Sequence, residues 1–108
     1  MYKLIFAKNF KNDVKQSVNY IKHILQAPVA AERLKTEIRR TYKVIKNTPF
    51  IYPVVPNDYL ASMGFRFTMV KKYMLFYIVE ENQIKIIRFL YGHRDWINIL
   101  NNTNIIED

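Results

Sequence analysis

The stretch that decides the fold is GFRFTMVKKYMLFYIVEENQIKIIRFLYG, residues 64–92. It contains three apolar runs that are separated by two polar pairs. The runs are residues 64–70, 73–79 and 83–91, and the pairs are Lys71-Lys72 and Glu81-Asn82. The outer runs alternate as half-buried strands do, and the middle run is nearly continuous, as in a central strand. The pattern predicts a three-stranded antiparallel meander.

An arginine interrupts the last of these runs. Alternation is expected to place Ile87, Phe89 and Tyr91 on one face of the strand, and Ile84, Ile86, Arg88 and Leu90 on the other. An Arg among Ile residues is paired with an acid, partly solvated on an open sheet face, or functional. Asp95 and Glu80 are the expected partners if Arg88 is paired.

Two helices are predicted ahead of the meander, over residues 9–25 and 29–46. Their apolar residues recur every three or four positions, which is the spacing of one helix face. The two faces are Phe10, Val14, Val18, Ile21 and Leu25, then Ala31, Leu34, Ile38, Tyr42 and Ile45. Asn12 or Asp13 is the expected N-cap of the first helix, and Ala27-Pro28 ends it. So short a link favours an antiparallel helical hairpin.

The remaining segments complete one α+β domain that spans residues 1–108. Residues 2–7 are predicted to form a first strand, and residues 94–101 a final helical turn. Residues 48–63 contain three prolines and are expected to form an ordered loop, which aromatic side chains pin to the fold. Those side chains are Phe50, Tyr52 and Tyr59. The expected order is therefore β-α-α-β-β-β.

The charge of the chain calls for a partner. Lys and Arg number 17 against 9 Asp and Glu, which gives a net charge of +8. Such an excess repels itself in a compact domain, so we expect nucleic acid, a nucleic-acid-bound machine or an acidic protein to compensate it. A membrane partner is not expected, because no segment joins a basic face to a broad apolar one.

Several classes of chemistry have no support in the sequence. There is no cysteine, which excludes disulfides, cysteine-ligated zinc and thiol nucleophiles. His23 and His93 are far apart in sequence, and neither a metal site nor a cofactor is expected. No apolar run reaches the length of a signal-peptide core or a membrane span, which favours a cytoplasmic protein.

The candidate functional residues are the basic ones of the meander and the segment after it. They are Arg66, Lys71, Lys72, Arg88, His93 and Arg94. Together they predict a sheet face with cations beside aromatic rings. Such a face suits phosphates with bases stacked on the rings, and it equally suits an acidic protein segment.

Three stretches resemble the RelE/ParE toxin superfamily and together cover most of the chain. They are YIKHIL with PVAAERL (residues 20–25 and 28–34), RFTMVKKYMLFYIV (66–79) and IKIIRFLYGHRDWINIL (84–100). The resemblance implies the toxin of a type II toxin–antitoxin system, of the kind that arrests growth and stabilises plasmids. It also implies a cognate acidic antitoxin that holds the toxin inactive.

The superfamily has two known targets. RelE-like members cut messenger RNA on the ribosome, whereas ParE-like members inhibit DNA gyrase and need no catalytic residues. This chain has Met74 where RelE-like nucleases carry an Arg, and Leu100 where they carry a Tyr or His. The resemblance is therefore closer to ParE-like members, with gyrase as the expected target.

Three hypotheses follow for the site. In a ParE-like toxin, the expected contacts with target or partner are Lys71, Lys72, Asp95 and Trp96. The alternative is a ribosome-dependent mRNA endonuclease, whose expected catalytic residues are Arg66, Arg88, His93 and Arg94. The second alternative is a non-toxic binding module of the same fold.

Overall fold

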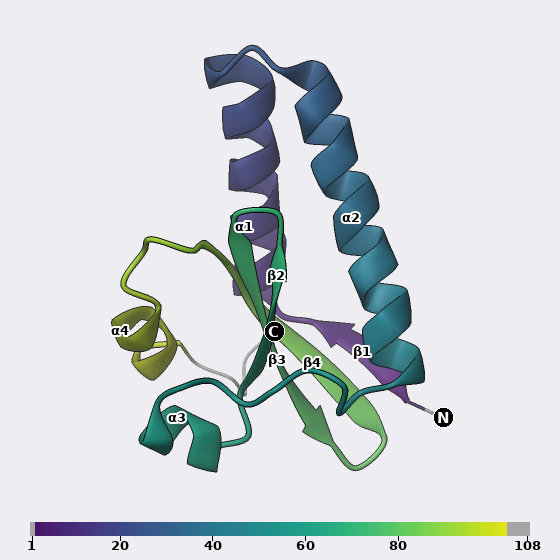
Figure 1. Cartoon of the computed structure of the whole chain (residues 1–108), viewed down its shortest axis with the longest axis vertical. Helices are drawn as coiled ribbons and strands as arrows, with labels where there is room; N and C mark the ends of the chain where they lie inside the picture. The colour runs from purple at the N-terminus through teal and green to yellow at the C-terminus, as the bar shows by residue number, and fades with distance from the viewer. Residues whose placement is uncertain (1, 104–108) are drawn as a thin grey trace.

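The computed structural model describes residues 2–103 and is built on a four-stranded sheet in the order β1-β4-β3-β2 (Figure 1). The strands are β1 (Lys3–Phe6), β2 (Arg66–Val70), β3 (Tyr73–Glu80) and β4 (Gln83–Tyr91). The last three form the predicted antiparallel meander, and β1 pairs in parallel with β4. The predicted α+β class and element order are confirmed.

A helical hairpin covers one face of the sheet (Figure 1). It consists of α1 (Lys8–Asn19), a π-helical turn η1 (Tyr20–Ile24) and α2 (Pro28–Asn47). The predicted cap of α1 is wrong, because β1 runs straight into the helix with Ala7 as N-cap. The Ala7 N–H still donates to the Ile86 carbonyl, so one residue ends the strand and begins the helix. Asp13 therefore lies inside α1, where it is buried.

Two apolar cores fill the two faces of the sheet. The hairpin side includes Phe10, Leu34, Ile38, Ile45, Leu75, Tyr77, Ile84, Ile86 and Phe89. The opposite side includes Val55, Leu60, Phe65, Phe76, Ile87, Leu90 and Leu100. Most of the predicted helix faces are confirmed by this packing, but Leu25 is 55% exposed. Because both faces of β3 are covered, its nearly continuous apolar run is explained.

The predicted loop is ordered, and one of its three predicted aromatic anchors is confirmed, because Tyr52 packs against the hairpin-side core. Phe50 and Tyr59 are 57% and 65% exposed, whereas Val55 and Leu60 are buried. A short helix that the sequence analysis missed, α3 (Asp58–Ser62), begins where the Asn57 side chain accepts the Leu60 N–H. Together with α4 (Trp96–Asn101), which confirms the predicted final turn, α3 covers the second face of the sheet. None of the helices in residues 2–103 is both long and apolar enough to cross a bilayer.

A β-bulge changes the faces of β4. Arg88 lies opposite Phe76 and Ile86 lies opposite Tyr77, so Ile87 has no partner across the ladder. An extra residue reverses the alternation beyond it. The predicted faces of this strand are therefore wrong after Ile87: Phe89 belongs to the hairpin-side core with Ile86, and Leu90 to the other core with Ile87. Nothing in the local apolar pattern marks this insertion.

Tyr77 connects the sheet to the start of the loop. Its hydroxyl donates to the Pro49 carbonyl at 2.8 Å, and burial raises the pKa of Tyr77 to about 12. We expect Tyr77→Phe to lower the free energy of unfolding by about 1–2 kcal/mol, because a buried carbonyl loses its donor. Urea denaturation at pH 7 measures this, with the exposed Tyr59→Phe as control.

The same pair of proteins gives a pH test. The neutral Tyr77 phenol makes its full contribution to the free energy of unfolding below pH 10, the pKa of an unperturbed tyrosine. This contribution is lost as the pH rises towards 12. The stability difference between the wild-type protein and Tyr77→Phe should therefore shrink over that range. A difference that stays constant from pH 8 to 12 would contradict the assignment.

Candidate functional site

An open groove of about 980 Å³ runs between the helical hairpin and the end of the meander. The hairpin forms one wall, with Ile21 and Leu34 among its apolar residues, and the sheet contributes Tyr73 and Phe89. The groove is lined by Asp13, Gln16, Ser17, Tyr20, Ile21, Leu25, Ala27, Ala30, Arg33, Leu34, Lys71, Lys72, Tyr73, Phe89, Tyr91 and Arg94. Its lining therefore joins an apolar floor to basic side chains.

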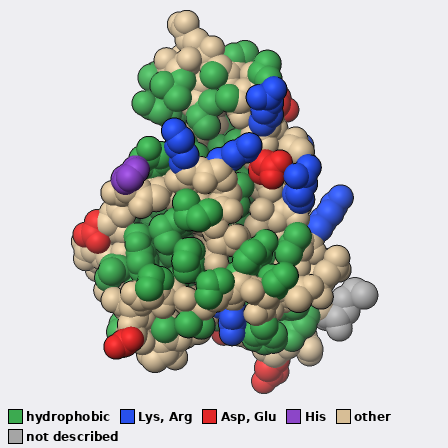
Figure 2. Space-filling view, in the orientation of Figure 1, with side chains coloured by type: hydrophobic (Ala, Val, Ile, Leu, Met, Phe, Trp, Pro, Cys, Tyr) green, Lys and Arg blue, Asp and Glu red, His purple; other side chains and the backbone are tan. Residues whose placement is uncertain are grey.

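Four cations from three places in the sequence line this groove. Arg33 comes from α2, Lys71 and Lys72 from the turn between β2 and β3, and Arg94 from the segment after β4. Figure 2 shows Lys and Arg side chains between the tip of the hairpin and the body of the sheet. Among the described residues that line the groove, the only acid is Asp13, which is already paired. The groove thus presents an uncompensated positive charge.

One backbone contact brings the two basic segments of the meander together. The Gly92 N–H donates to the Lys72 carbonyl at 2.8 Å, which ties the end of β4 to the β2–β3 turn. A Cβ atom at position 92 would lie 3.2 Å from that carbonyl oxygen, so the close approach favours glycine. This contact places Arg94 beside Lys71 and Lys72.

Aromatic rings line the same end of the groove. Tyr73 stacks on Phe89 with ring centroids 4.8 Å apart, and Tyr91 meets Tyr73 edge-on at 5.8 Å. His93 lies against Tyr91 at 5.3 Å. Burial raises the pKa of Tyr73, so this phenol is neutral at physiological pH. The rings offer apolar area and hydroxyl groups without adding negative charge.

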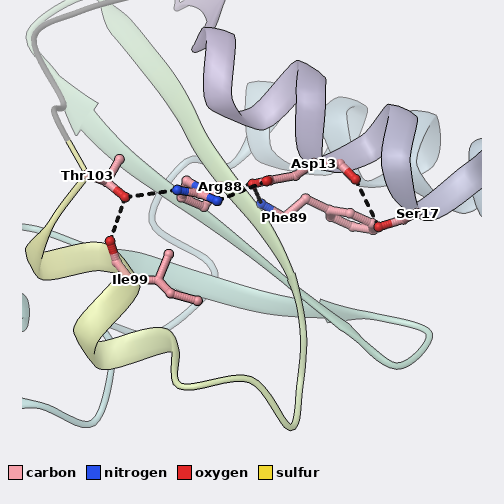
Figure 3. Close-up of polar contacts among 6 residues, drawn as sticks. All are labelled: Asp13, Ser17, Arg88, Phe89, Ile99 and Thr103. Atoms are coloured by element: carbon pink, nitrogen blue, oxygen red, sulfur yellow. Dashed lines mark hydrogen bonds and ion pairs between the residues drawn. The ribbon is translucent and has the colours of Figure 1, made fainter.

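Arg88 is engaged in an ion pair with Asp13 (Figure 3). Its Nε and Nη2 donate to the two carboxylate oxygens at 2.7 and 2.9 Å, and Asp13 also accepts the Phe89 N–H at 3.0 Å. Arg88 Nη1 donates to Thr103 Oγ1 at 3.2 Å. Both charged side chains are largely buried, with 16% of Arg88 and 10% of Asp13 exposed.

The predicted partners of Arg88 are therefore wrong. Glu80 pairs with Lys85 across the β3–β4 hairpin, and Asp95 accepts the Asn98 N–H as the N-cap of α4. Asp13 lies 75 residues from Arg88 in sequence and reaches it only because α1 packs on β4.

Arg66 lies away from the groove. Its Nη1 donates to the Tyr52 carbonyl at 2.6 Å, and its guanidinium lies 5.0 Å from the centre of the Phe50 ring. Arg66 is opposite Tyr77 in the sheet, whereas the groove residue Tyr91 is opposite Tyr73. Four residues of strand separate the two positions, about 13 Å at the usual rise.

The structure thus brings together only part of the predicted set. Lys71, Lys72 and Arg94 line one groove with the exposed His93 next to it, while Arg66 and Arg88 contact other partners. Trp96 stacks on Phe76 at 5.6 Å and is half-buried in the second core. Within residues 2–103, no cluster of His, Asp and Glu could hold a metal ion.

The residues that the hairpin contributes to the groove were not predicted from the sequence. Tyr20 and Arg33 line it, yet each occupies an ordinary exposed helical position. Only the packing of the hairpin on the sheet turns them towards the basic residues of the meander, so periodicity carries no signal for them.

Comparison with known proteins identifies the family of the chain. A family model described as "ParE toxin of type II toxin-antitoxin system, parDE" matches residues 4–96. The chain belongs to the ParE toxin family. This confirms the resemblance to the RelE/ParE superfamily, on its ParE side.

The ParE fold is also found among solved structures. One of them, described as "Chromosomal ParDE TA system from P. aeruginosa", is similar to this chain with a TM-score of 0.68. The match covers 84% of this chain and 96% of the other at 16% identity, so it shows a shared fold alone. Among curated proteins, no sequence matches the chain.

The Arg88 network of this ParE chain should be structural. We expect Arg88→Ala to lower the free energy of unfolding by about 3 kcal/mol, because it leaves the Asp13 carboxylate buried without its cation. Urea denaturation measures this. The matched control is Arg94→Ala, which removes an exposed arginine and should change stability by less than about 0.5 kcal/mol. Equal stability of the two variants would contradict a structural role.

Proposed function

We propose that this chain is the growth-arresting toxin of a toxin–antitoxin pair, and that it acts by binding DNA gyrase. The proposal rests on one observation: two of the predicted nuclease residues are already bound by other groups of the fold. Arg88 is held by Asp13, and Arg66 by the Tyr52 carbonyl. RNA cleavage needs a base, a cation over the phosphate and a proton donor at one phosphodiester. Membership of the ParE family supports inhibition by protein contact, in the cytoplasm where gyrase works.

The groove is the proposed site of neutralisation by the cognate antitoxin. Its floor is apolar and its free charges are positive, so it suits an amphipathic segment with carboxylates along its edges. Release of that segment then exposes the toxin. A basic toxin with an acidic antitoxin also explains why the chain tolerates a net charge of +8.

The nuclease remains the second candidate because of one observation. His93 is exposed beside Tyr91, close to the cations of the groove, and a histidine acts as an acid or a base near neutral pH. The reaction of such a nuclease would be cleavage of messenger RNA on the ribosome. The third candidate, a non-toxic binding module, predicts harmless expression without any antitoxin.

Two assays on the purified toxin separate these candidates. We expect inhibition of DNA supercoiling by gyrase, and intact message in cell-free translation monitored by primer extension. New message ends that appear only during translation would replace the proposal with the nuclease. Normal supercoiling, intact message and normal growth on expression would favour the non-toxic module.

The antitoxin site has its own test. We expect the triple variant Lys71→Glu, Lys72→Glu, Arg94→Glu to bind the cognate antitoxin at least about a hundredfold more weakly, because like charges would meet across the groove. Titration calorimetry at low salt measures the affinity. The control reverses three exposed lysines outside the groove, at Lys11, Lys15 and Lys46. Equal losses in both variants would show a general effect of charge and no groove site.

A further inference from the structure

The tip of the helical hairpin carries a second surface that the groove does not explain. It consists of large apolar side chains in η1 and in the first turns around it, here called the tip patch. The tip patch is Tyr20, Ile24, Leu25 and Val29, which are 51%, 69%, 55% and 63% exposed. Ile24 and Val29 lie outside the groove lining, whereas Tyr20 and Leu25 belong to both surfaces. Figure 2 shows hydrophobic side chains gathered over this end of the molecule.

A change of helix type creates the tip patch. The Leu25 N–H donates to the Tyr20 carbonyl at 3.0 Å, which is the i→i+5 bond of a π-helix. This wider turn delays the rotation of the chain, so Leu25 no longer lies over Ile21 as the α-helical spacing predicts. The side chain then points outward. Turns of this type are frequent at functional sites.

The turn after the π-helix is also unfavourable by itself. Gln26 adopts a φ of +51°, a left-handed conformation that normally favours glycine. The Ala27 N–H donates across the turn to the Ile21 carbonyl at 3.0 Å. The chain thus combines a strained turn with exposed apolar area at one point, and contact with a partner would bury that apolar area.

The charge at the tip selects the kind of partner. Lys22 and His23 lie within the π-helical turn, and Arg33 follows one turn into α2. The only acid between residues 14 and 36 is Glu32, which pairs with Lys35 at 2.7 Å. An apolar patch beside the cations Lys22 and Arg33 fits a protein surface with an apolar pocket and carboxylates at its rim. Nucleic acid offers phosphates but no pocket for Ile24 and Val29.

The shape of the tip selects a folded partner. The hairpin projects beyond the sheet along the longest axis of the molecule (Figure 1), so the tip patch is convex. A short antitoxin segment fills a groove but has no concavity of its own. The convex tip patch is complementary in shape to a pocket in a folded protein.

We propose that the tip patch is the surface through which this toxin binds its protein target. The inference rests on the proposed function for the identity of that target, gyrase. It also gives neutralisation a physical basis: because Tyr20 and Leu25 line the groove as well, a segment in the groove covers half of the tip patch. The antitoxin and the target then compete directly.

The test is the double variant Ile24→Ser, Val29→Ser, which removes the two apolar side chains that belong to the tip patch but not to the groove. Their exposure predicts an unchanged fold, checked by urea denaturation. Affinity for purified gyrase should fall about a hundredfold, since each lost anchor is worth roughly tenfold. Growth arrest on expression should be lost, and affinity for the cognate antitoxin should stay within about threefold.

The matched control is Ile51→Ser, Tyr59→Ser, which removes two side chains that are 55% and 65% exposed in the loop and α3. It should arrest growth as the wild-type protein does. Full toxicity of the folded tip variant overturns the proposal, as does equal loss of toxicity in the control. Unchanged antitoxin affinity separates the tip patch from the groove.

The two levels of the inference fail differently. Normal supercoiling with the wild-type toxin rejects gyrase as the target. Comparing growth arrest by the tip variant and by the control variant still shows whether the tip patch binds the target. A photoreactive side chain in place of Ile24, tested against purified gyrase and duplex DNA together, identifies the class of partner. Crosslinks to gyrase support the proposal, and crosslinks to DNA overturn it.

Discussion

The pairing of Asp13 with Arg88 is the constraint on which the rest of the structure depends. Strand β1 ends at Phe6 and pairs with β4 only as far as Ile86, so the outer edge of β4 is unpaired beyond that point. An unpaired edge in a partly buried place leaves backbone donors without partners. The Asp13 carboxylate accepts the Phe89 N–H at 3.0 Å and so continues the ladder with a side chain. Within residues 2–103, no buried side-chain polar atom lacks a partner.

This arrangement connects α1, β4 and the end of the described chain. Arg88 neutralises the carboxylate that the edge requires, and the Ser17 hydroxyl donates to the Asp13 carbonyl within α1. Arg88 also donates to Thr103, whose hydroxyl donates in turn to the Ile99 carbonyl of α4. The contacts of Asp13 with Arg88 and Phe89 hold α1 against β4. Arg88, which the sequence suggests as a catalytic residue, is thus held in a structural ion pair.

The proposed binding surfaces lie on the part of the hairpin that the Asp13–Arg88 pair does not hold. The hairpin is held at its base, where α1 packs on β4, and its far end projects beyond the sheet (Figure 1). The groove and the tip patch both lie towards that free end, and they share Tyr20 and Leu25. Positive charge is left over there because the nearby acids, Asp13 and Glu32, are paired within the chain. Surfaces of this kind suit binding to acidic proteins more than chemistry on a phosphate.

The sequence by itself determined the elements and their order, since apolar periodicity and prolines act locally. The runs of residues 64–92 predicted the meander, the three- and four-residue spacing predicted the hairpin, and both are confirmed. Only the tertiary structure decided the bulge at Ile87, the π-turn at Tyr20 and the pairing of Asp13 with Arg88. Each of these depends on groups distant in sequence or on the fit between packed layers, and local periodicity carries no information about either. The groove residues were predictable as basic, but their meeting place was set by the packing of the hairpin on the sheet.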